Sequence, residues 1–414
     1  MRVSELFTKT SKSVPADEVA KNAQLLIRAG FIYKEMAGVY DYLPLGKIVL
    51  DKIIQIIREE MDAVGGNEMS LTALQQKETW VASGRWSDEV MGIWFKTKLA
   101  NGSEVGLAPT HEEPLTKLMK NFIQSYKDLP VYPYQFQIKF RNELRSKNGL
   151  LRGREFWMKD LYSFCRDRTE HEIFYEKMSQ AYAKVYSRLG VGDITYKTFA
   201  SGGSFCKYSH EFQTVSDIGE DKIYVYEGKK IAINQEVFND EVLADLGIAR
   251  NELVEKTAVE VGNIFTLGTK FSDALDLKYT DEAGENKPVF MGSYGIGPSR
   301  IMGLLAEHFS DDKGLVWPEN IAPFKVYLVR IGDDGVNVYA DNIYDKLISQ
   351  GIETLYDDRD IRPGQKFADS ELIGIPYRVT VSDQMQSDGL YELVERKNGQ
   401  KKLLTYEQLL AKLN

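Results

Sequence analysis

Nine of the residues from Lys139 to Arg168 are basic and only four are acidic. The segment therefore carries a net charge of +5, whereas the whole chain of 414 residues has a formal net charge of -9. A run of charges often marks only a solvated surface. Here, however, Arg141 and Glu143 stand two positions apart, on one face of an expected strand, and Arg152 and Phe156 follow after a loop, with the returning strand. Guanidinium, carboxylate and aromatic groups in this order can grip phosphates, accept a hydrogen bond from a base and stack on its ring.

A glycine-rich segment far downstream is the second candidate. Residues 292–297 hold three glycines, and Pro298 and Arg300 follow before an apolar run over 301–308. The pattern predicts a strand that turns into a helix where another group can approach the backbone closely. The spacing matches neither the GxGxxG turn nor the P-loop, so neither motif would hold a phosphate here. Alone, such a turn is weak evidence for nucleotide binding.

Metal chemistry has little support in the sequence. His111, His171 and His210 each precede a glutamate, but none has a second histidine four positions later, as a zinc peptidase helix requires. Cys165 and Cys206 lie too far apart for the close-paired ligands of a structural zinc site. We therefore expect no zinc and two reduced thiols.

Taken in chain order, the basic and the glycine-rich segments resemble motifs 2 and 3 of the class II aminoacyl-tRNA synthetases. The resemblance implies ATP binding and amino-acid activation, with Arg141 gripping the α-phosphate and the substrate carboxylate. It further implies that Glu143 accepts a hydrogen bond from the adenine amino group, and that Phe156 stacks on the adenine ring. Arg152 and Arg300 would reach the γ-phosphate. Arg141 and Arg300 are thus the predicted catalytic residues, and Mg²⁺ bound with ATP is the implied cofactor.

Longer stretches are similar to the bacterial-type prolyl-tRNA synthetases over nearly the whole chain. These stretches are LIRAGFI at 26–32, YLPLG at 42–46, SGRW at 83–86, PTHEE at 109–113 and MKDLYSF at 158–164. The resemblance implies that Thr110 and Glu112 bind the imino group of L-proline and that Arg141 binds its carboxylate. It makes three further side chains candidates for the proline pocket, namely Trp157, His210 and Phe212. For each of these three, a place in the packed core suits the residue type equally well.

These side chains need a scaffold, and its elements can be read from the spacing of apolar residues. Helical spacing over 48–64, ended by a glycine pair, predicts a long amphipathic helix. Alternating, β-prone runs at 131–138 and 156–164 predict an antiparallel pair joined by the basic loop. We therefore predict an α+β catalytic domain with an antiparallel sheet over residues 1–322.

Beyond two closely spaced prolines, Pro318 and Pro323, the pattern changes. Strand-like and helical runs alternate from there, which is typical of a small α/β domain over 323–414. The strands are expected at 325–331, 377–381 and 391–395, and the helices at 337–350 and 405–413. The stretch from 357 to 376 is similar to the anticodon-binding domain of the class IIa synthetases. This similarity implies tRNA(Pro) as a partner, with Arg359 and Lys366 as candidate anticodon contacts.

The chain departs from the bacterial family between motifs 2 and 3. Many members carry a large insertion there that hydrolyses alanine mischarged onto proline tRNA, whereas only the short segment 221–260 occupies that place here. Because a pocket for proline cannot exclude the smaller alanine by steric means, binding alone would discriminate by only about 1–3 kcal/mol. We therefore expect mischarging with alanine, no editing in cis, and a separate trans-editing protein.

A second departure concerns assembly. In the family, motif 1 is a long helix followed by a strand that ends in proline and helps to form a dimer interface. At that position this chain has Thr72. A homodimer is nevertheless expected.

Composition places the protein among globular chains. Hydrophobic residues make up 43% and charged residues 27%. No run of about 18 apolar residues and no apolar signal segment occurs, so membrane insertion and export are not indicated and a cytoplasmic location is expected.

Two rival functions share much of this pattern. A synthetase-like paralogue that binds tRNA without charging it would usually have lost ATP-contacting residues or the anticodon domain. An enzyme that loads a carrier protein would not need the anticodon domain. Since the chain keeps both features, charging of tRNA(Pro) with proline is the favoured prediction.

Overall fold

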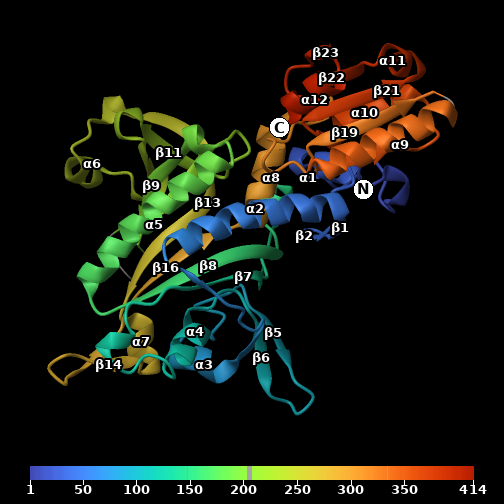
Figure 1. Cartoon of the computed structure of the whole chain (residues 1–414). Coiled ribbons are helices and arrows are strands. Elements are labelled where there is room, and N and C mark those ends of the chain that lie inside the picture. Colours follow the sequence, from blue (N-terminus) through green and yellow to red (C-terminus); the bar gives the residue numbers. More distant parts are fainter. Residues whose placement is uncertain (147, 203–207, 333) are drawn as a thin grey trace.

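The computed structural model describes residues 1–146, 148–202, 208–332 and 334–414. A large sheet with helices on one face forms the body of the molecule, and the C-terminal α/β unit packs against one end of it (Figure 1). Cys206 lies outside the described residues. Cys165 is buried, and burial raises the pKa of its thiol to about 12.

The central sheet has nine strands in the spatial order β10-β9-β12-β11-β13-β16-β8-β7-β3, and β10 also pairs with β13. In chain order they are β3 (Asn67–Glu68), β7 (Pro133–Phe140), β8 (Glu155–Cys165), β9 (Thr195–Ser201), β10 (Tyr208–Val215), β11 (Asp221–Tyr226), β12 (Ile231–Asn234), β13 (Val254–Gly268) and β16 (Phe290–Ile296). Most neighbours are antiparallel, as predicted. Because of the extra pairing, the five strands β9, β10, β11, β12 and β13 form a closed ring at one end of the sheet.

Helices cover one face of this sheet, as Figure 1 shows for α2 and α5. They are α1 (Lys21–Arg28), α2 (Pro44–Ala63), α5 (Arg168–Arg188) and α8 (Pro298–His308). The helix predicted over 48–64 is confirmed as α2, which begins earlier because Pro44 suits the first helical turn. Its buried residues recur with helical spacing and face the sheet and its neighbouring helices. The face of the sheet opposite these helices is thereby left for the site.

The predicted strand pair is confirmed as β7 and β8, in the register Tyr134↔Leu161 to Phe140↔Glu155. The sequence pattern placed Arg141 and Glu143 on a strand, but β7 ends at Phe140, so that both residues lie in the loop beyond it. There the backbone is held by the hydrogen bond from Arg141 N to the Arg154 carbonyl, 2.8 Å. The loop conformation therefore directs these two side chains, rather than strand alternation.

A lobe of small elements closes the far end of the sheet, at the bottom of Figure 1. It holds β4 (Leu74–Gln76), β5 (Phe95–Lys98), β6 (Glu104–Leu107), β14 (Lys278–Thr280), β15 (Asn286–Pro288), α3 (Lys77–Ala82), α4 (Glu112–Met119) and α7 (Lys270–Leu275). Its apolar cluster joins Leu115 of α4 to Phe271 of α7 and to Met291 of β16. This packing fixes the start of α4 against the sheet.

The segment 221–260, which stands in place of a large insertion, is built into the central sheet. It consists of the antiparallel hairpin β11–β12, the helix α6 (Asp240–Leu246) and the beginning of β13. Small apolar clusters beneath the hairpin and α6 anchor it to its neighbours. The segment is thus an extension of the sheet.

The C-terminal unit has a five-stranded mixed sheet in the order β20-β19-β21-β22-β23, flanked by helices. Its elements are β19 (Val326–Ile331), α9 (Asp334–Ser349), β20 (Thr354–Asp357), α10 (Pro363–Ile373), β21 (Tyr377–Ser382), α11 (Asp383–Asp388), β22 (Tyr391–Glu395), β23 (Lys401–Leu404) and α12 (Tyr406–Leu413). The two pairings of β19 are parallel and the others are antiparallel. The strands and helices predicted here are confirmed to within a few residues.

Two hairpins and several single turns complete the chain. The hairpins are β1 (Ile32–Met36) with β2 (Val39–Tyr42), and β17 (Ser310–Asp311) with β18 (Gly314–Leu315). The 3-10 turns are η1 (Val3–Glu5), η2 (Tyr126–Asp128), η3 (Gly149–Leu151), η4 (Gly192–Ile194), η5 (Glu227–Lys229), η6 (Gln235–Val237) and η7 (Arg250–Glu252).

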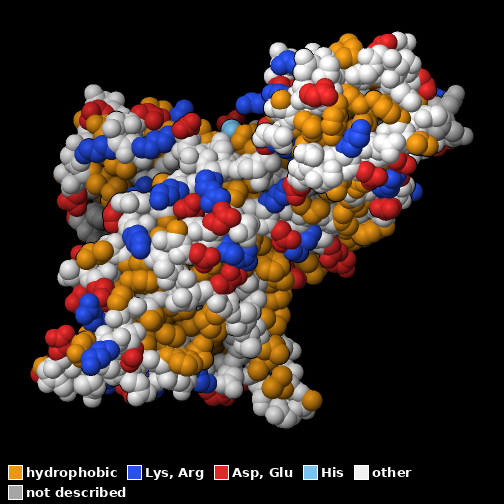
Figure 2. Space-filling view, in the orientation of Figure 1, with side chains coloured by type: hydrophobic (Ala, Val, Ile, Leu, Met, Phe, Trp, Pro, Cys, Tyr) orange, Lys and Arg blue, Asp and Glu red, His pale blue; other side chains and the backbone are white. Residues whose placement is uncertain are grey.

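One apolar core runs from the large sheet into the C-terminal unit. Trp317, which is 3% exposed, lies 5.6 Å from Phe31 between ring centroids and donates its backbone N–H to the Gly374 carbonyl. Leu315 of β18 and Ile373 of α10 belong to the same core. On the outside, basic and acidic side chains are interspersed over the visible face (Figure 2). No helix in the described part of the chain is both long and apolar enough to span a bilayer.

Candidate active site

Two adjoining cavities open on the sheet face opposite the helices. The first has a volume of about 230 Å³ and the second of about 320 Å³. Three residues line both cavities: Arg141, Met158 and Asn263. Because Arg141 stands at the junction, its guanidinium can reach ligands on either side.

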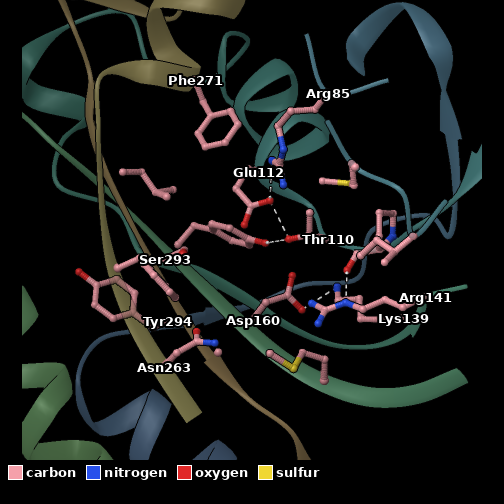
Figure 3. A pocket seen from close by; sticks show the side chains of 18 residues that line it. Arg85, Thr110, Glu112, Lys139, Arg141, Asp160, Asn263, Phe271, Ser293 and Tyr294 are labelled. Atoms are coloured by element: carbon pink, nitrogen blue, oxygen red, sulfur yellow. Dashed lines mark hydrogen bonds and ion pairs between the residues drawn. The ribbon is translucent and has the colours of Figure 1, made fainter. Parts of the chain in front are cut away.

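The first cavity holds a hydroxyl and a carboxylate side by side at the start of α4 (Figure 3). Thr110 Oγ1 donates to Glu112 Oε2 at 2.6 Å, and Arg85 Nη1 approaches the same oxygen at 3.3 Å. The backbone that carries them continues the sheet, because Phe140 N donates to the Ala108 carbonyl. Arg141 is tied to the same loop through its Nε and the Pro109 carbonyl, 3.4 Å. The three residues predicted to bind proline are thus brought together.

A buried polar chain supports the floor of this cavity. Lys139 Nζ lies 2.8 Å from Asp160 Oδ1 and 2.6 Å from His111 Nδ1, and His111 Nε2 contacts the Thr72 carbonyl at 3.1 Å. Burial and, as the smaller cause, the charge of Lys139 lower the pKa of His111 to about 4. Burial alone would raise the pKa of Asp160, but Lys139 holds it below its ordinary value. The neutral imidazole therefore accepts from the ammonium group, and the carboxylate stays ionised.

The second cavity contains the residues predicted for ATP. Phe156 lies beneath Arg141, with 5.3 Å between the guanidinium carbon and the ring centroid. Glu143 and Arg152 form an ion pair at 2.8 Å, and both line the cavity. An aromatic face and a carboxylate beside it are the features that an adenine ring can use.

Arg300 reaches the second cavity from the first turn of α8. Its Nη1 donates to the Glu260 carbonyl at 2.7 Å and lies 3.2 Å from Glu260 Oε2. Burial of Arg141 lowers the pKa of its guanidinium, and the nearby charge of Arg300 lowers it as the smaller cause. Two guanidinium groups that repel each other in this way form a site for an anion. Glu260 is a carboxylate of the kind that Mg²⁺ takes when it binds mainly through phosphates and water.

The three residues proposed as further walls of the proline pocket line neither cavity. Since alternate residues of a strand face opposite sides, β8 turns Phe156 and Met158 to the cavities and Trp157 to the helix side. Phe212 is 3% exposed and packs against Tyr182 of α5 with ring centroids 5.1 Å apart. Neither side chain therefore lines the first cavity: Phe212 belongs to the core, and Trp157, which is partly buried, packs against it.

His210 lies on the same side of β10 as Phe212. Its Nδ1 is 2.8 Å from the hydroxyl of Tyr175 on α5, and its ring packs on Phe199. Burial lowers the pKa of His210 to about 3. The structure thus places His210 among the helix-facing side chains, away from Thr110 and Glu112.

The two predicted anticodon contacts are engaged within the C-terminal unit. Lys366 is 3% exposed and donates to the Arg330 carbonyl at 2.9 Å, which contradicts the prediction that its ammonium group meets RNA. Arg359 donates to both oxygens of Asp357 and to Asp369, with distances of 2.7–2.8 Å. Its guanidinium therefore holds the sheet and α10 together.

Sequence reasoning missed several residues of the first cavity. Arg85 and Phe271 come from the small lobe, and Asp160, Tyr162 and Ser293 come from β8 and β16. Strand alternation counted from Phe156 would have found Asp160 and Tyr162. The SGRW stretch contains Arg85, but nothing in its spacing gave that residue a role. No local signal pointed to Phe271, because its place depends on how the lobe packs on the sheet.

Comparison with known protein families agrees with this geometry. Residues 95–309 match the class II tRNA synthetase core domain of the synthetases abbreviated G, H, P, S and T, and residues 325–414 match an anticodon-binding domain. The fold is similar to that of prolyl-tRNA synthetase from Cryptosporidium parvum complexed with L-proline and AMP. That comparison has a TM-score of 0.76 and 18% identity, and covers 94% of this chain and 73% of the other.

Curated relatives match from end to end. The chain is 35% identical to a proline-tRNA ligase of Agrobacterium fabrum, over 100% of this chain and 99% of the relative. It is 37% identical to one of Zymomonas mobilis, over 98% and 97% respectively. With these relatives and the two matched domains, the chain belongs to the prolyl-tRNA synthetases, the proline-tRNA ligases of class II.

Proposed function

We propose that the protein activates L-proline with ATP to give prolyl-adenylate and pyrophosphate, and then transfers the prolyl group to the 3′ end of tRNA(Pro). The observation that carries this proposal is the position of Arg141 between two cavities. One cavity offers Thr110 and Glu112, and the other offers Phe156 and Arg300. An amino acid and a nucleotide would therefore meet at a single guanidinium.

The first cavity suits a secondary ammonium group. Proline has two N–H donors there, and Glu112 Oε1 and Thr110 Oγ1 can accept one each. The Thr110 hydroxyl donates its proton in a hydrogen bond to Glu112 Oε2, so the lone pairs of Oγ1 stay free to accept another. Arg141 would bind the carboxylate, and apolar groups such as Phe271 and Met158 would pack against the ring.

Activation needs positioning and charge stabilisation more than acid–base chemistry. A proline carboxylate oxygen would attack the α-phosphorus, the bond to the bridging oxygen would break, and pyrophosphate would leave with that electron pair. Arg141 would balance the charge that develops on the α-phosphate, and Arg300 would hold the departing end. Mg²⁺ bound with ATP, with Glu260 as its protein carboxylate, would supply further charge compensation. No side chain needs to act as a general base.

The division of labour follows the two units. Residues 1–322 would carry activation and transfer, and 323–414 would read the anticodon. Arg359 and Lys366 form hydrogen bonds within that unit, so other residues would contact the anticodon. A homodimer and a cytoplasmic location remain predictions. At the end of motif 1, the Thr72 carbonyl accepts a hydrogen bond from His111, the residue between Thr110 and Glu112.

We also propose that the protein has no editing activity in cis. The segment 221–260 extends the central sheet by a hairpin and a short helix. This chain covers 99% of the relative from Agrobacterium fabrum, so that relative has no large insertion at this place. Purified enzyme should therefore form alanyl-tRNA(Pro) at a measurable rate and release no alanine from it. Cleavage of alanyl-tRNA(Pro) by this chain alone would contradict the proposal.

Proline-dependent exchange of pyrophosphate into ATP, followed by charging of tRNA(Pro), tests the main proposal. Both activities are expected. Exchange without charging of tRNA would instead favour an enzyme that loads a carrier, and the absence of both would favour a binding protein.

A further inference from the structure

Arg85 is a cation held by several groups beside the proposed proline site. Its Nη1 lies 3.3 Å from Glu112 Oε2 and 3.1 Å from each oxygen of Glu113 (Figure 3 shows the contact with Glu112). Its guanidinium carbon lies over two rings, 5.2 Å from the centroid of Trp80 and 5.3 Å from that of Phe271. Two carboxylates and two aromatic rings therefore constrain this guanidinium.

We propose that Arg85 is a positioning residue for proline recognition: it fixes the carboxylate of Glu112 so that Oε1 is the oxygen presented to the imino group. This inference rests on the proposed function of Glu112 and Thr110. It assigns a role to the SGRW stretch, which the proposed reaction leaves without one.

The geometry around Glu112 explains how this would work. Its Oε2 accepts from Thr110 at 2.6 Å and from Arg85, whereas no described residue donates a hydrogen bond to Oε1. Two donors on one oxygen prevent the carboxylate from rotating. The oxygen that remains without a donor is on a side chain that lines the first cavity.

The surroundings of Arg85 show why arginine suits this place. Glu113 is completely buried, and Ser83 Oγ donates to it at 2.7 Å. This buried carboxylate accepts from the same Nη1 that contacts Glu112, and the guanidinium lies over both aromatic rings. Phe271 lines the cavity, so Arg85 also holds an apolar wall of the pocket in place. Lysine can supply the charge, but it has no planar guanidinium to lie over the two rings.

The test measures proline-dependent pyrophosphate exchange in the full-length enzyme. We expect Arg85→Gln to raise KM for proline about tenfold to a hundredfold, the range for losing a hydrogen bond to a charged group. The KM for ATP should change by less than about twofold, because Arg85 lies outside the second cavity. Arg166→Gln, which breaks an exposed pair with Glu170, is the matched control and should leave both constants unchanged.

A double-variant cycle separates positioning from general stability. If Arg85 acts through Glu112, adding Arg85→Gln to Glu112→Gln should raise KM for proline by less than about twofold more. Full additivity of the two effects would overturn the inference, as would an unchanged KM for proline in Arg85→Gln. If Arg85→Gln does not fold, Arg85→Lys should show a smaller rise, and an unchanged KM there would also overturn it.

Failure of the underlying function would look different. In that case the wild-type enzyme would show no proline-dependent exchange, or Glu112→Gln would leave KM for proline unchanged, and both proposals would fall together. A normal response of Glu112→Gln with no response of Arg85→Gln would overturn the positioning role alone.

Discussion

At the scale of single residues, Arg141 is the side chain proposed to bind both the proline carboxylate and the α-phosphate. It is the charged side chain that lines both cavities, and it stacks over Phe156. Arg141→Ala should reduce pyrophosphate exchange by at least about a hundredfold, the effect of removing one group that stabilises a transition state. Arg145→Ala, which changes an exposed arginine of the same loop, is the control. Retained exchange in Arg141→Ala would show that the assignment to motif 2 is wrong.

His210 supports a second prediction at this scale. Burial lowers its pKa to about 3. Near pH 6.5 the imidazole is therefore protonated in the unfolded chain but stays neutral in the folded chain. The free energy of unfolding should therefore fall as the pH drops below about 6.5. Between about pH 7.5 and 5.5, His210→Gln should lose about 1 kcal/mol less than the wild type in denaturant titrations. Equal losses would mean that His210 is protonated in the folded protein.

At the scale of elements, the glycine-rich strand β16 packs closely on β8 and β13. A Cβ on Gly295 would lie 2.6 Å from Met158 Cε and 2.9 Å from Asn263 Oδ1, the two residues besides Arg141 that line both cavities. Gly295→Ala should push them into the cavities and raise KM for both proline and ATP by about tenfold, roughly 1.4 kcal/mol. Gly364→Ala in α10, where a Cβ would meet nothing within 4 Å, is the control. A raised KM for only one of the two substrates would contradict the proposal that Met158 and Asn263 form a wall common to both cavities.

At the scale of the whole molecule, the continuous core implies that the two units unfold together. Leu315 is completely buried where β18 packs on α10. A single calorimetric transition is expected for the wild type, and Leu315→Ala should reduce the free energy of unfolding by about 2–5 kcal/mol. Two well-separated transitions in the wild-type protein would show that the shared core does not couple the units.

Much of this arrangement could be predicted from the sequence, because the relevant signals are local. Helical and alternating periods located α2, β7, β8 and the C-terminal elements β19, α9, β21, β22 and α12 to within a few residues. The motif order and the spacing around Arg141 indicated the family, which the full-length relatives then showed. Local signals succeed here because a helix or strand selects its own pattern of apolar residues along the chain.

What only the tertiary structure decided is which face each side chain takes and which distant group it meets. Phe212 belongs to the core and Trp157 packs against it, because their strands turn both side chains toward the helices. Lys366 looked available to RNA in the sequence, but folding buries it against backbone carbonyls. Arg85 meets Glu112 because α3 and α4 pack together within the small lobe. Such contacts join residues far apart in the chain, and their energies depend on burial and geometry that exist only after folding.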